Sequence, residues 1–123
     1  MVIDTGIFIE HLRAKDKLNT TLYLLPDHTA LFISSVTIYE LYMGATTPEK
    51  ETDAVLLTED LVVLPFTDAV ALKAAQIYHQ LRRKNKMIEF RDIFIAATCI
   101  IHELPLITLN KKHFNRIEEL QLV

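Results

Sequence analysis

The stretch ALFISSVTIYELYMG, residues 30–44, changes its pattern in the middle. Residues 30–33 are apolar and predict a short buried strand. Ser34 or Ser35 can cap the helix that follows, which we expect to run to Met43 with Gly44 near its end. A short strand followed directly by a helix is typical of α/β proteins.

The same alternation of short apolar runs and helical patterns continues along the chain. We expect further strands at 1–3, 61–64 and 106–108, and a fifth at 121–123. We expect helices at 5–12, 15–25, 48–59, 67–83, 92–101 and 111–114, the second of them stopped by Pro26. The two glycines of the chain are too few for the turns of an all-β fold. The prediction is an α/β fold with a mostly parallel sheet of four to five strands, formed by residues 1–123 as one domain.

Composition limits the cellular setting. The chain has 123 residues, a formal net charge of −3 and one cysteine, Cys99, which lies within an apolar run and cannot form an internal disulfide. A buried reduced thiol is typical of a reducing compartment. No stretch has the apolar length of a membrane span, and Asp4 interrupts the apolar start where a signal peptide would need continuity. We therefore expect a cytoplasmic protein.

Polar residues follow the predicted strands. Asp4 comes directly after the first strand and Asn110 follows the fourth. The segment after the second strand carries Ser34 and Ser35 and, a helical turn further, Glu40. Asp92 begins the most apolar helix, where Glu89 is the other acid able to start it. Asp4 and Asp92 also suit a helix cap, Asn110 suits a turn, and Glu40 could simply lie on the solvent face of its helix. Because parallel strands place their functional crevice beyond their carboxyl ends, we expect the four to face one crevice.

Like charges gathered in a crevice repel, so a cation is their natural partner. Carboxylate and amide oxygens without histidine or cysteine favour Mg²⁺ or Mn²⁺. The chain has five histidines, but none shows the spacing of a zinc site. The acids therefore predict a site for a hard divalent cation.

Two basic clusters counter the net negative charge. One contains Arg82, Arg83, Lys84, Lys86 and Arg91, and the other contains Lys111, Lys112, His113 and Arg116. Cations at helix ends are common without any ligand, because they suit the helix dipole. A phosphate-binding surface is the functional alternative.

Four blocks of this sequence resemble the PIN-domain family, and in particular its VapC-type toxin ribonucleases. The blocks are Val2-Ile3-Asp4-Thr5, then 33–41 with Gly44, then Asp92-Ile93-Phe94-Ile95-Ala96-Ala97, and then 106–114 with Ile117 and Leu120. They follow the family's order and spacing from the first residue nearly to the last. The resemblance implies a three-layer α/β/α domain, a ribonuclease dependent on Mg²⁺ or Mn²⁺, a homodimer, and an antitoxin whose tail blocks the site.

The resemblance also implies roles for individual residues. Asp4, Glu40 and Asp92 would hold the metal and Asn110 would help to orient it. Three hydroxyl residues would hydrogen-bond the carboxylates, namely Thr5, Ser35 and Thr108. Candidates for contact with the RNA backbone are Arg82, Arg83, Lys86, Arg91 and Lys111.

Two positions depart from the family's pattern and keep a second function open. Gly6 stands where Asn or Ser is common, and Asn110 stands where the fourth acid is often Asp. The alternative is a catalytically weak PIN-fold module that binds RNA or a partner protein without cleavage. Asp4-Thr5-Gly6 also matches the motif of aspartic proteases, but their fold is all-β and rich in glycine, unlike this chain.

Overall fold

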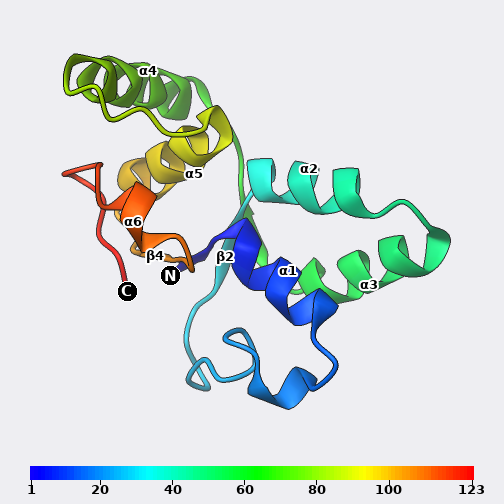
Figure 1. Cartoon of the computed structure of the whole chain (residues 1–123). Helices are drawn as coiled ribbons and strands as arrows, with labels where there is room; N and C mark the ends of the chain where they lie inside the picture. The colour runs from blue at the N-terminus through cyan, green and yellow to red at the C-terminus, as the bar shows by residue number, and fades with distance from the viewer.

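Four short parallel strands form the centre of the molecule. The computed structural model describes residues 1–123, and its sheet has the order β3-β2-β1-β4 (Figure 1). The strands are β1 (Val2–Ile3), β2 (Phe32–Ser34), β3 (Val62–Leu64) and β4 (Leu106–Ile107). Every neighbouring pair is parallel. All four carboxyl ends therefore lie along one edge of the sheet.

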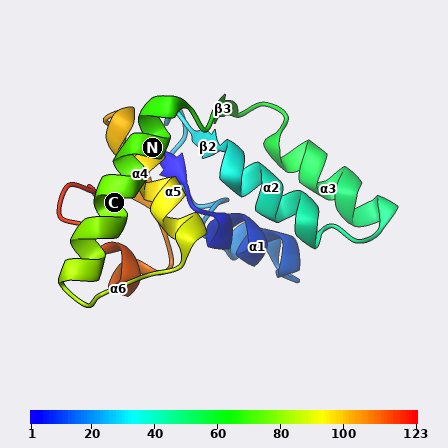
Figure 2. The ribbon, with the colours of Figure 1, turned by 90° about the horizontal axis from the view of Figure 1, so that it is seen from above.

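Six helices connect and flank these strands. They are α1 (Thr5–Arg13), α2 (Ser35–Gly44), α3 (Pro48–Thr58), α4 (Asp68–Arg83), α5 (Phe90–Ile101) and α6 (Lys111–Phe114). Viewed from above, α4, α5 and α6 lie together on one side and α1, α2 and α3 on the other (Figure 2). None of these helices has the length and apolar content required to span a bilayer.

Two hydrophobic cores, one on each face of the sheet, make the fold a three-layer α/β/α arrangement. Val2 and Leu106 belong to the larger core, which contains the buried residues of α4, α5 and α6. Ile3 and Ile33 belong to the smaller one, with Ile7 and Leu41 of the opposite helices. Successive residues of a strand point to opposite faces, so Val2 and Ile3 enter different cores. The predicted fold class is confirmed.

Side-chain caps fix where the helices begin. Ser34 rather than Ser35 caps α2, and Thr67 caps α4. Glu89 caps α5 by accepting a hydrogen bond from Arg91 N, so Asp92 is the third residue of that helix and not its cap. An acid in the first turn still suits the helix dipole. The carboxyl of Asp92 is thereby left free for another role.

The helix predicted at 15–25 is wrong, since only a 3₁₀ turn, Lys17–Asn19, forms there. Asp16 accepts a hydrogen bond from Leu18 N, while Thr21 N donates to Glu10 and the Thr20 hydroxyl pairs with His11. Such side-chain bonds compete with helical ones. The predicted fifth strand is reduced to one bridge between Leu106 and Leu122, because β4 is only two residues long.

Candidate active site

Asp4 lies at the carboxyl edge of the sheet, between β1 and α1. Its carboxylate accepts two hydrogen bonds, one from Thr5 N at 2.9 Å and one from Thr108 Oγ1 at 2.6 Å. The side chain is buried, with only 6% of the residue exposed. A carboxylate has about four lone-pair positions, so two hydrogen bonds still leave it able to bind a cation.

Glu40 projects from α2 toward the same edge. Its Oε1 lies 2.8 Å from the hydroxyl of Thr5, and that hydroxyl lies 3.0 Å from the hydroxyl of Thr37. The sequence interpretation included Thr5 but missed Thr37, which is fully buried. Thr37 could have been found from the sequence, because it lies three residues before Glu40 and residues three apart on a helix share a face. Thr5 therefore links the end of β1 to α2.

Asp92 completes the acidic cluster, which we define as Asp4, Glu40 and Asp92. Its half-buried carboxyl makes no hydrogen bond with any other group of the chain. Burial, together with the negative charges of Asp4, Glu89 and Glu40, raises its pKa to about 6. The three acids come from distant segments, yet they interact electrostatically.

Burial also raises the pKa of the other two acids. For Asp4, hydrogen bonds from Thr108 and Thr5 oppose the increase in pKa caused by burial. For Glu40, the hydrogen bond from Thr5 and the positive charge of Arg91 lower the pKa, while Asp4 raises it. Each of the three carboxylates is thus destabilised in its charged form. A bound cation would relieve that cost.

The donor chemistry of the cluster fits a hard divalent cation. All the candidate donors are carboxylate, hydroxyl or amide oxygens, which is the set that Mg²⁺ or Mn²⁺ prefers. No three acidic, histidine or cysteine side chains are already arranged around a common point in the structure. Thr5 and Thr108 instead hydrogen-bond to the carboxylates, so binding an ion would require side-chain rotation or bridging water.

Asn110 connects to the cluster through Thr108. Its backbone N–H donates to Thr108 Oγ1 at 2.9 Å, and its side-chain nitrogen lies 2.9 Å from His113 Nδ1. The same threonine hydroxyl donates to Asp4. Asn110 is therefore held beside the acids, but its amide is engaged with His113, a contact that the sequence did not predict.

Ser35 differs from its expected role. Its hydroxyl accepts a hydrogen bond from Phe66 N at 3.1 Å, which ties the start of α2 to the segment after β3. It contacts none of the carboxylates. Thr5 and Thr108 are the two of the three expected hydroxyl residues that do.

The basic residues expected at RNA differ in the contacts that they make within the chain. Arg91 Nε lies 3.2 Å from Glu89 Oε1 and 3.8 Å from Glu40 Oε2, so this guanidinium contacts the acidic cluster. Arg82 donates to the hydroxyl of Tyr78. The other three, Arg83, Lys86 and Lys111, are exposed and form no ion pair within the chain.

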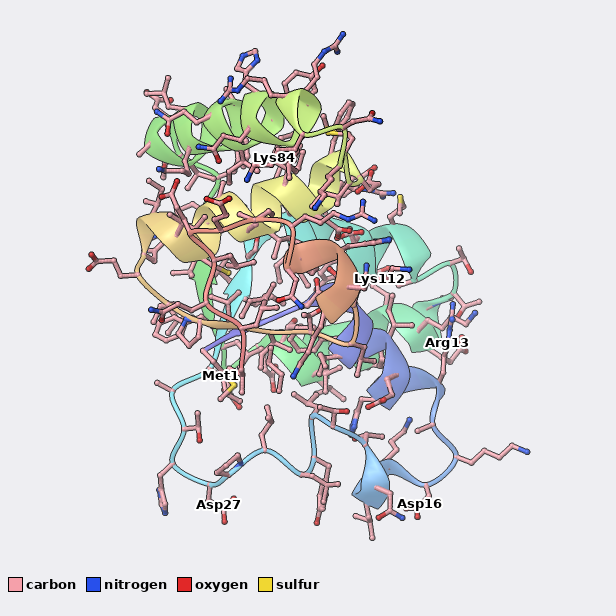
Figure 3. All side chains as sticks on the ribbon, turned by 60° about the vertical axis from the view of Figure 1, so that its left-hand side comes forward. Met1, Arg13, Asp16, Asp27, Lys84 and Lys112 are labelled. Carbon is pink, nitrogen blue, oxygen red and sulfur yellow. The ribbon has the colours of Figure 1, made fainter.

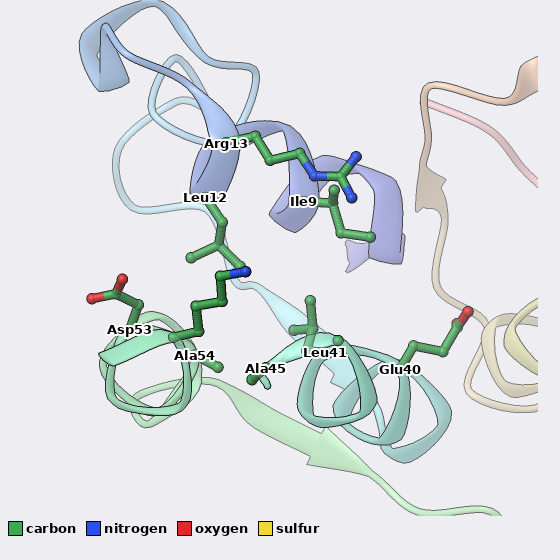
Figure 4. Close-up of a pocket in the computed structure, with 10 residues that line it drawn as sticks. Ile9, Leu12, Arg13, Glu40, Leu41, Ala45, Asp53 and Ala54 are labelled. Carbon is green, nitrogen blue, oxygen red and sulfur yellow. The ribbon is translucent and has the colours of Figure 1, made fainter. Parts of the chain in front are cut away.

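A groove of about 200 Å³ runs between α1 and the pair α2 and α3. Glu40 lies at one end of it and Asp53 at the other, and both apolar side chains and the cations Arg13 and Lys50 line the groove (Figure 4). The apolar part is formed by Ile9, Leu12, Leu41, Ala45 and Ala54. The groove thus leads directly to one member of the acidic cluster.

Comparison with known proteins gives the same assignment along the whole chain. The family model described as PIN domain matches residues 1–120. The chain is 31% identical over 121 residues to ribonuclease VapC10 of Mycobacterium tuberculosis, which covers 98% of this chain and 90% of that protein. It is 27% identical over 122 residues to ribonuclease VapC1 of Methanocaldococcus jannaschii, covering 99% and 84%.

Solved structures support the same family assignment. The structure of VapBC-1 from nontypeable Haemophilus influenzae superposes with a TM-score of 0.84 at 28% identity, covering 99% of this chain and 95% of the other. VapBC2 from Rickettsia felis, bound to a DNA fragment from its promoter, shares the fold with a TM-score of 0.87 at 23% identity, covering 99% and 96%. The chain therefore belongs to the PIN-domain family, and within it to the VapC type.

Proposed function

We propose that this chain is an endoribonuclease, the toxin of a VapBC-type pair, and that it hydrolyses RNA phosphodiesters with the help of Mg²⁺ or Mn²⁺. The observation that supports this most directly is the acidic cluster. Asp4, Glu40 and Asp92 come from three separate segments. The charge of Asp4 raises the pKa of Glu40, the charges of Asp4 and Glu40 raise the pKa of Asp92, and burial raises the pKa of Asp4. The relatives named ribonuclease VapC support the same reaction.

In this proposal Asp4, Glu40 and Asp92 hold the ion, directly or through water. The chemistry that such an ion supplies is activation of water and neutralisation of charge at the phosphate. Thr108 and Thr5 fix the Asp4 and Glu40 carboxylates by hydrogen bonds of 2.6 and 2.8 Å. Positioning by such partners is worth a large part of the activity of a metal site.

We further propose that an antitoxin pairs with this chain, as in the VapBC complexes that share its fold. The groove between α1 and α2 suits an apolar segment of that partner. Because Glu40 closes one end of the groove, a basic residue on the same segment would reach the acidic cluster. Occupation of the groove would then inhibit cleavage.

A homodimer is the proposed assembly. Tyr39 and Met43 on α2 are 58% and 53% exposed, and Phe90 at the start of α5 is 58% exposed. Large apolar side chains grouped at the surface favour contact with another protein surface. Sedimentation analysis at micromolar concentration should give twice the mass of one chain. The Tyr39→Asp variant should sediment with the mass of a single chain.

Cleavage of a fluorescently labelled single-stranded RNA tests the main proposal. Purified protein should cut it with Mg²⁺ or Mn²⁺ and lose activity in EDTA. Asp4→Asn and Asp92→Asn should each lower the rate by at least about 1000-fold, while the matched surface change Asp27→Asn leaves it unaltered. If the protein bound RNA but did not cleave it with any added metal ion, that result would instead support the non-catalytic module, which Gly6 and Asn110 permit.

A further inference from the structure

A shallow hollow of about 430 Å³ lies between the connection from α4 to α5 and the segment that begins with α6. Six residues line it: Asn85, Lys86, Met87, Lys112, Asn115 and Arg116. We call it the basic hollow. Figure 3 shows Lys112 on α6 at about mid-height of the molecule, well above Asp16 at its lower end.

Hydrogen bonds of the backbone hold one wall of the basic hollow in place. Two residues after the end of α4, Asn85 adopts the left-handed backbone conformation, with φ of 53°. Lys86 N donates to Leu81 O at 2.9 Å and Asn85 N donates to Arg82 O at 3.1 Å, which is the Schellman pattern of helix ends. The backbone that carries Lys86 is therefore fixed.

The two walls are also tied to each other. Arg116 Nη1 donates to Met87 O at 3.0 Å, across 29 residues of sequence. This bond uses one of the five donors of the guanidinium, so the others remain available. The hollow is thus a built feature of the fold and not a chance approach of two flexible chains.

The charge of the basic hollow is uncompensated. Lys86, Lys112 and Arg116 form no ion pair, and no acidic residue lines the hollow. The nearby Lys84, by contrast, is paired with Glu118. In a chain with net charge −3, three cations that face one space without a carboxylate favour an anionic ligand.

Each wall of the basic hollow leads, within a few residues of sequence, to a residue of the candidate active site. Lys86 precedes Asp92 by six residues, and Arg116 follows Asn110 by six residues. Even a fully extended chain of that length spans only about 20 Å. A single strand of nucleic acid a few nucleotides long can therefore contact both regions.

We propose that the basic hollow binds a backbone phosphate of the single-stranded RNA substrate, a few nucleotides from the bond that is cut. This inference rests on the proposed function. Lysine and arginine supply the charge, and the amides of Asn85 and Asn115 can donate to phosphate or sugar oxygens. The ligand class is a phosphodiester, and the hollow contributes affinity without taking part in bond cleavage.

The test compares two double variants that remove the same charge. Lys86→Gln/Lys112→Gln alters the basic hollow, and Lys15→Gln/Lys17→Gln (the α1 variant) alters the distant segment that follows α1. Affinity for a 12-nucleotide single-stranded RNA is measured in EDTA by fluorescence anisotropy, over a series of salt concentrations. Thermal unfolding followed by circular dichroism verifies that both variants are folded.

We expect the hollow variant to bind the RNA roughly tenfold more weakly at low salt. The slope of log affinity against log salt should become shallower by about 1.4, since each contact with a single strand contributes about 0.7. With metal present, KM should rise by a similar factor while kcat stays the same. The α1 variant should match the wild type.

Other results would overturn the proposal. Equal affinity of the two variants would show that the basic hollow does not touch RNA. Amide signals of residues 85–87 and 112–116 that respond to inorganic phosphate and not to RNA would mark a small-anion site. Loss of antitoxin binding with RNA affinity retained would mark a protein-docking surface.

Failure of the proposed ribonuclease function can be distinguished from failure of the proposal on the basic hollow. A wild-type chain that binds the RNA but never cuts it would remove the ribonuclease assignment. The comparison of dissociation constants would still decide whether the basic hollow contributes to binding.

Discussion

The acidic cluster and the basic hollow each contain side chains of like charge, but the two regions differ in how far burial and water affect the repulsion between those charges. The carboxyls of Asp4, Glu40 and Asp92 are wholly or partly buried, and burial is the largest cause of their raised pKa values. Lys86 and Lys112 are exposed, and water screens their repulsion. The acidic cluster therefore holds unfavourable electrostatic free energy that a bound cation can relieve, whereas the basic hollow only attracts anions.

Outside the acidic cluster itself, removing the hydroxyl that supports Asp4 should have the largest effect on cleavage. Thr108→Val keeps the shape of the side chain but deletes its hydrogen bonds to Asp4 Oδ2 and Asn110 N. We expect metal-dependent RNA cleavage to fall by roughly 10- to 100-fold. The initial rate of cleavage at saturating metal measures this.

Thr58→Val is the matched control, because Thr58 is also buried and its hydroxyl bonds only to Ala54 O within its own helix. It should cleave RNA at the wild-type rate. Equal activity of the Thr108 and Thr58 variants would show that Thr108 does not position Asp4.

Neutralising Asp92 should stabilise the ion-free protein. A rise in pKa from 3.8 to about 6 means that folding disfavours the ionised carboxyl. A change of that size corresponds to about 3 kcal/mol for a buried group, and we reduce it to about 1–2 kcal/mol because water screens a half-exposed carboxyl. Asp92→Asn should raise the free energy of unfolding by that amount at pH 7 in EDTA.

Because folding raises the pKa of Asp92, the effect of this residue on stability depends on pH. Between pH 3.8 and about 6 the folded state binds more protons at Asp92 than the unfolded state, so stability falls as pH rises through this range. The gain in Asp92→Asn should therefore be small at pH 4 and complete by pH 7. Urea unfolding at both pH values measures it. Lys112→Gln should change stability by less than about 0.5 kcal/mol, and a larger gain there would contradict the contrast between the regions.

Much of the fold could be predicted from local sequence. Ser34, Thr67 and Pro48 mark helix starts, and the apolar runs mark the strands. Residues 15–25 could not be predicted in this way, because Thr20 and Thr21 bond to His11 and Glu10 on a neighbouring helix. Those contacts form only when the tertiary structure does.

The three acids could be assigned to one edge of the sheet because Asp4 directly follows a strand, Asp92 lies in the first turn of a helix, and Glu40 lies on the helix that follows another strand. The contacts between them could not. Thr37 behind Thr5, and Arg91 beside Glu40, depend on how α1, α2 and α5 approach one another. Sequence order carries no direct signal of that approach, so Arg91 was predicted as an RNA contact although it lies against two acids.

Arg91→Gln tests which of these two roles Arg91 fills. Its guanidinium lowers the pKa of Glu40 and adds positive charge to the acidic cluster. Without it, Mn²⁺ should bind roughly threefold more tightly, as expected for the loss of one partly exposed ionic contact. Isothermal titration calorimetry measures the affinity. An unchanged Mn²⁺ affinity with a raised KM for RNA would instead support the predicted RNA contact.

The smallest expected effect concerns Gly6, beside Asp4 at the start of α1. A Cβ built at Gly6 meets no atom within 4 Å, and its φ is not positive, so alanine fits there without strain. Gly6→Ala should raise the free energy of unfolding by roughly 0.5 kcal/mol, because alanine loses less backbone entropy on folding. Gly44→Ala, at the last residue of α2, should gain less, since helix ends fray. RNA cleavage by Gly6→Ala should stay within twofold of wild type. A clear loss of stability or activity would mean that the open space beside Asp4 is itself required, and that the departure from Asn or Ser at this position belongs to the chemistry of the acidic cluster.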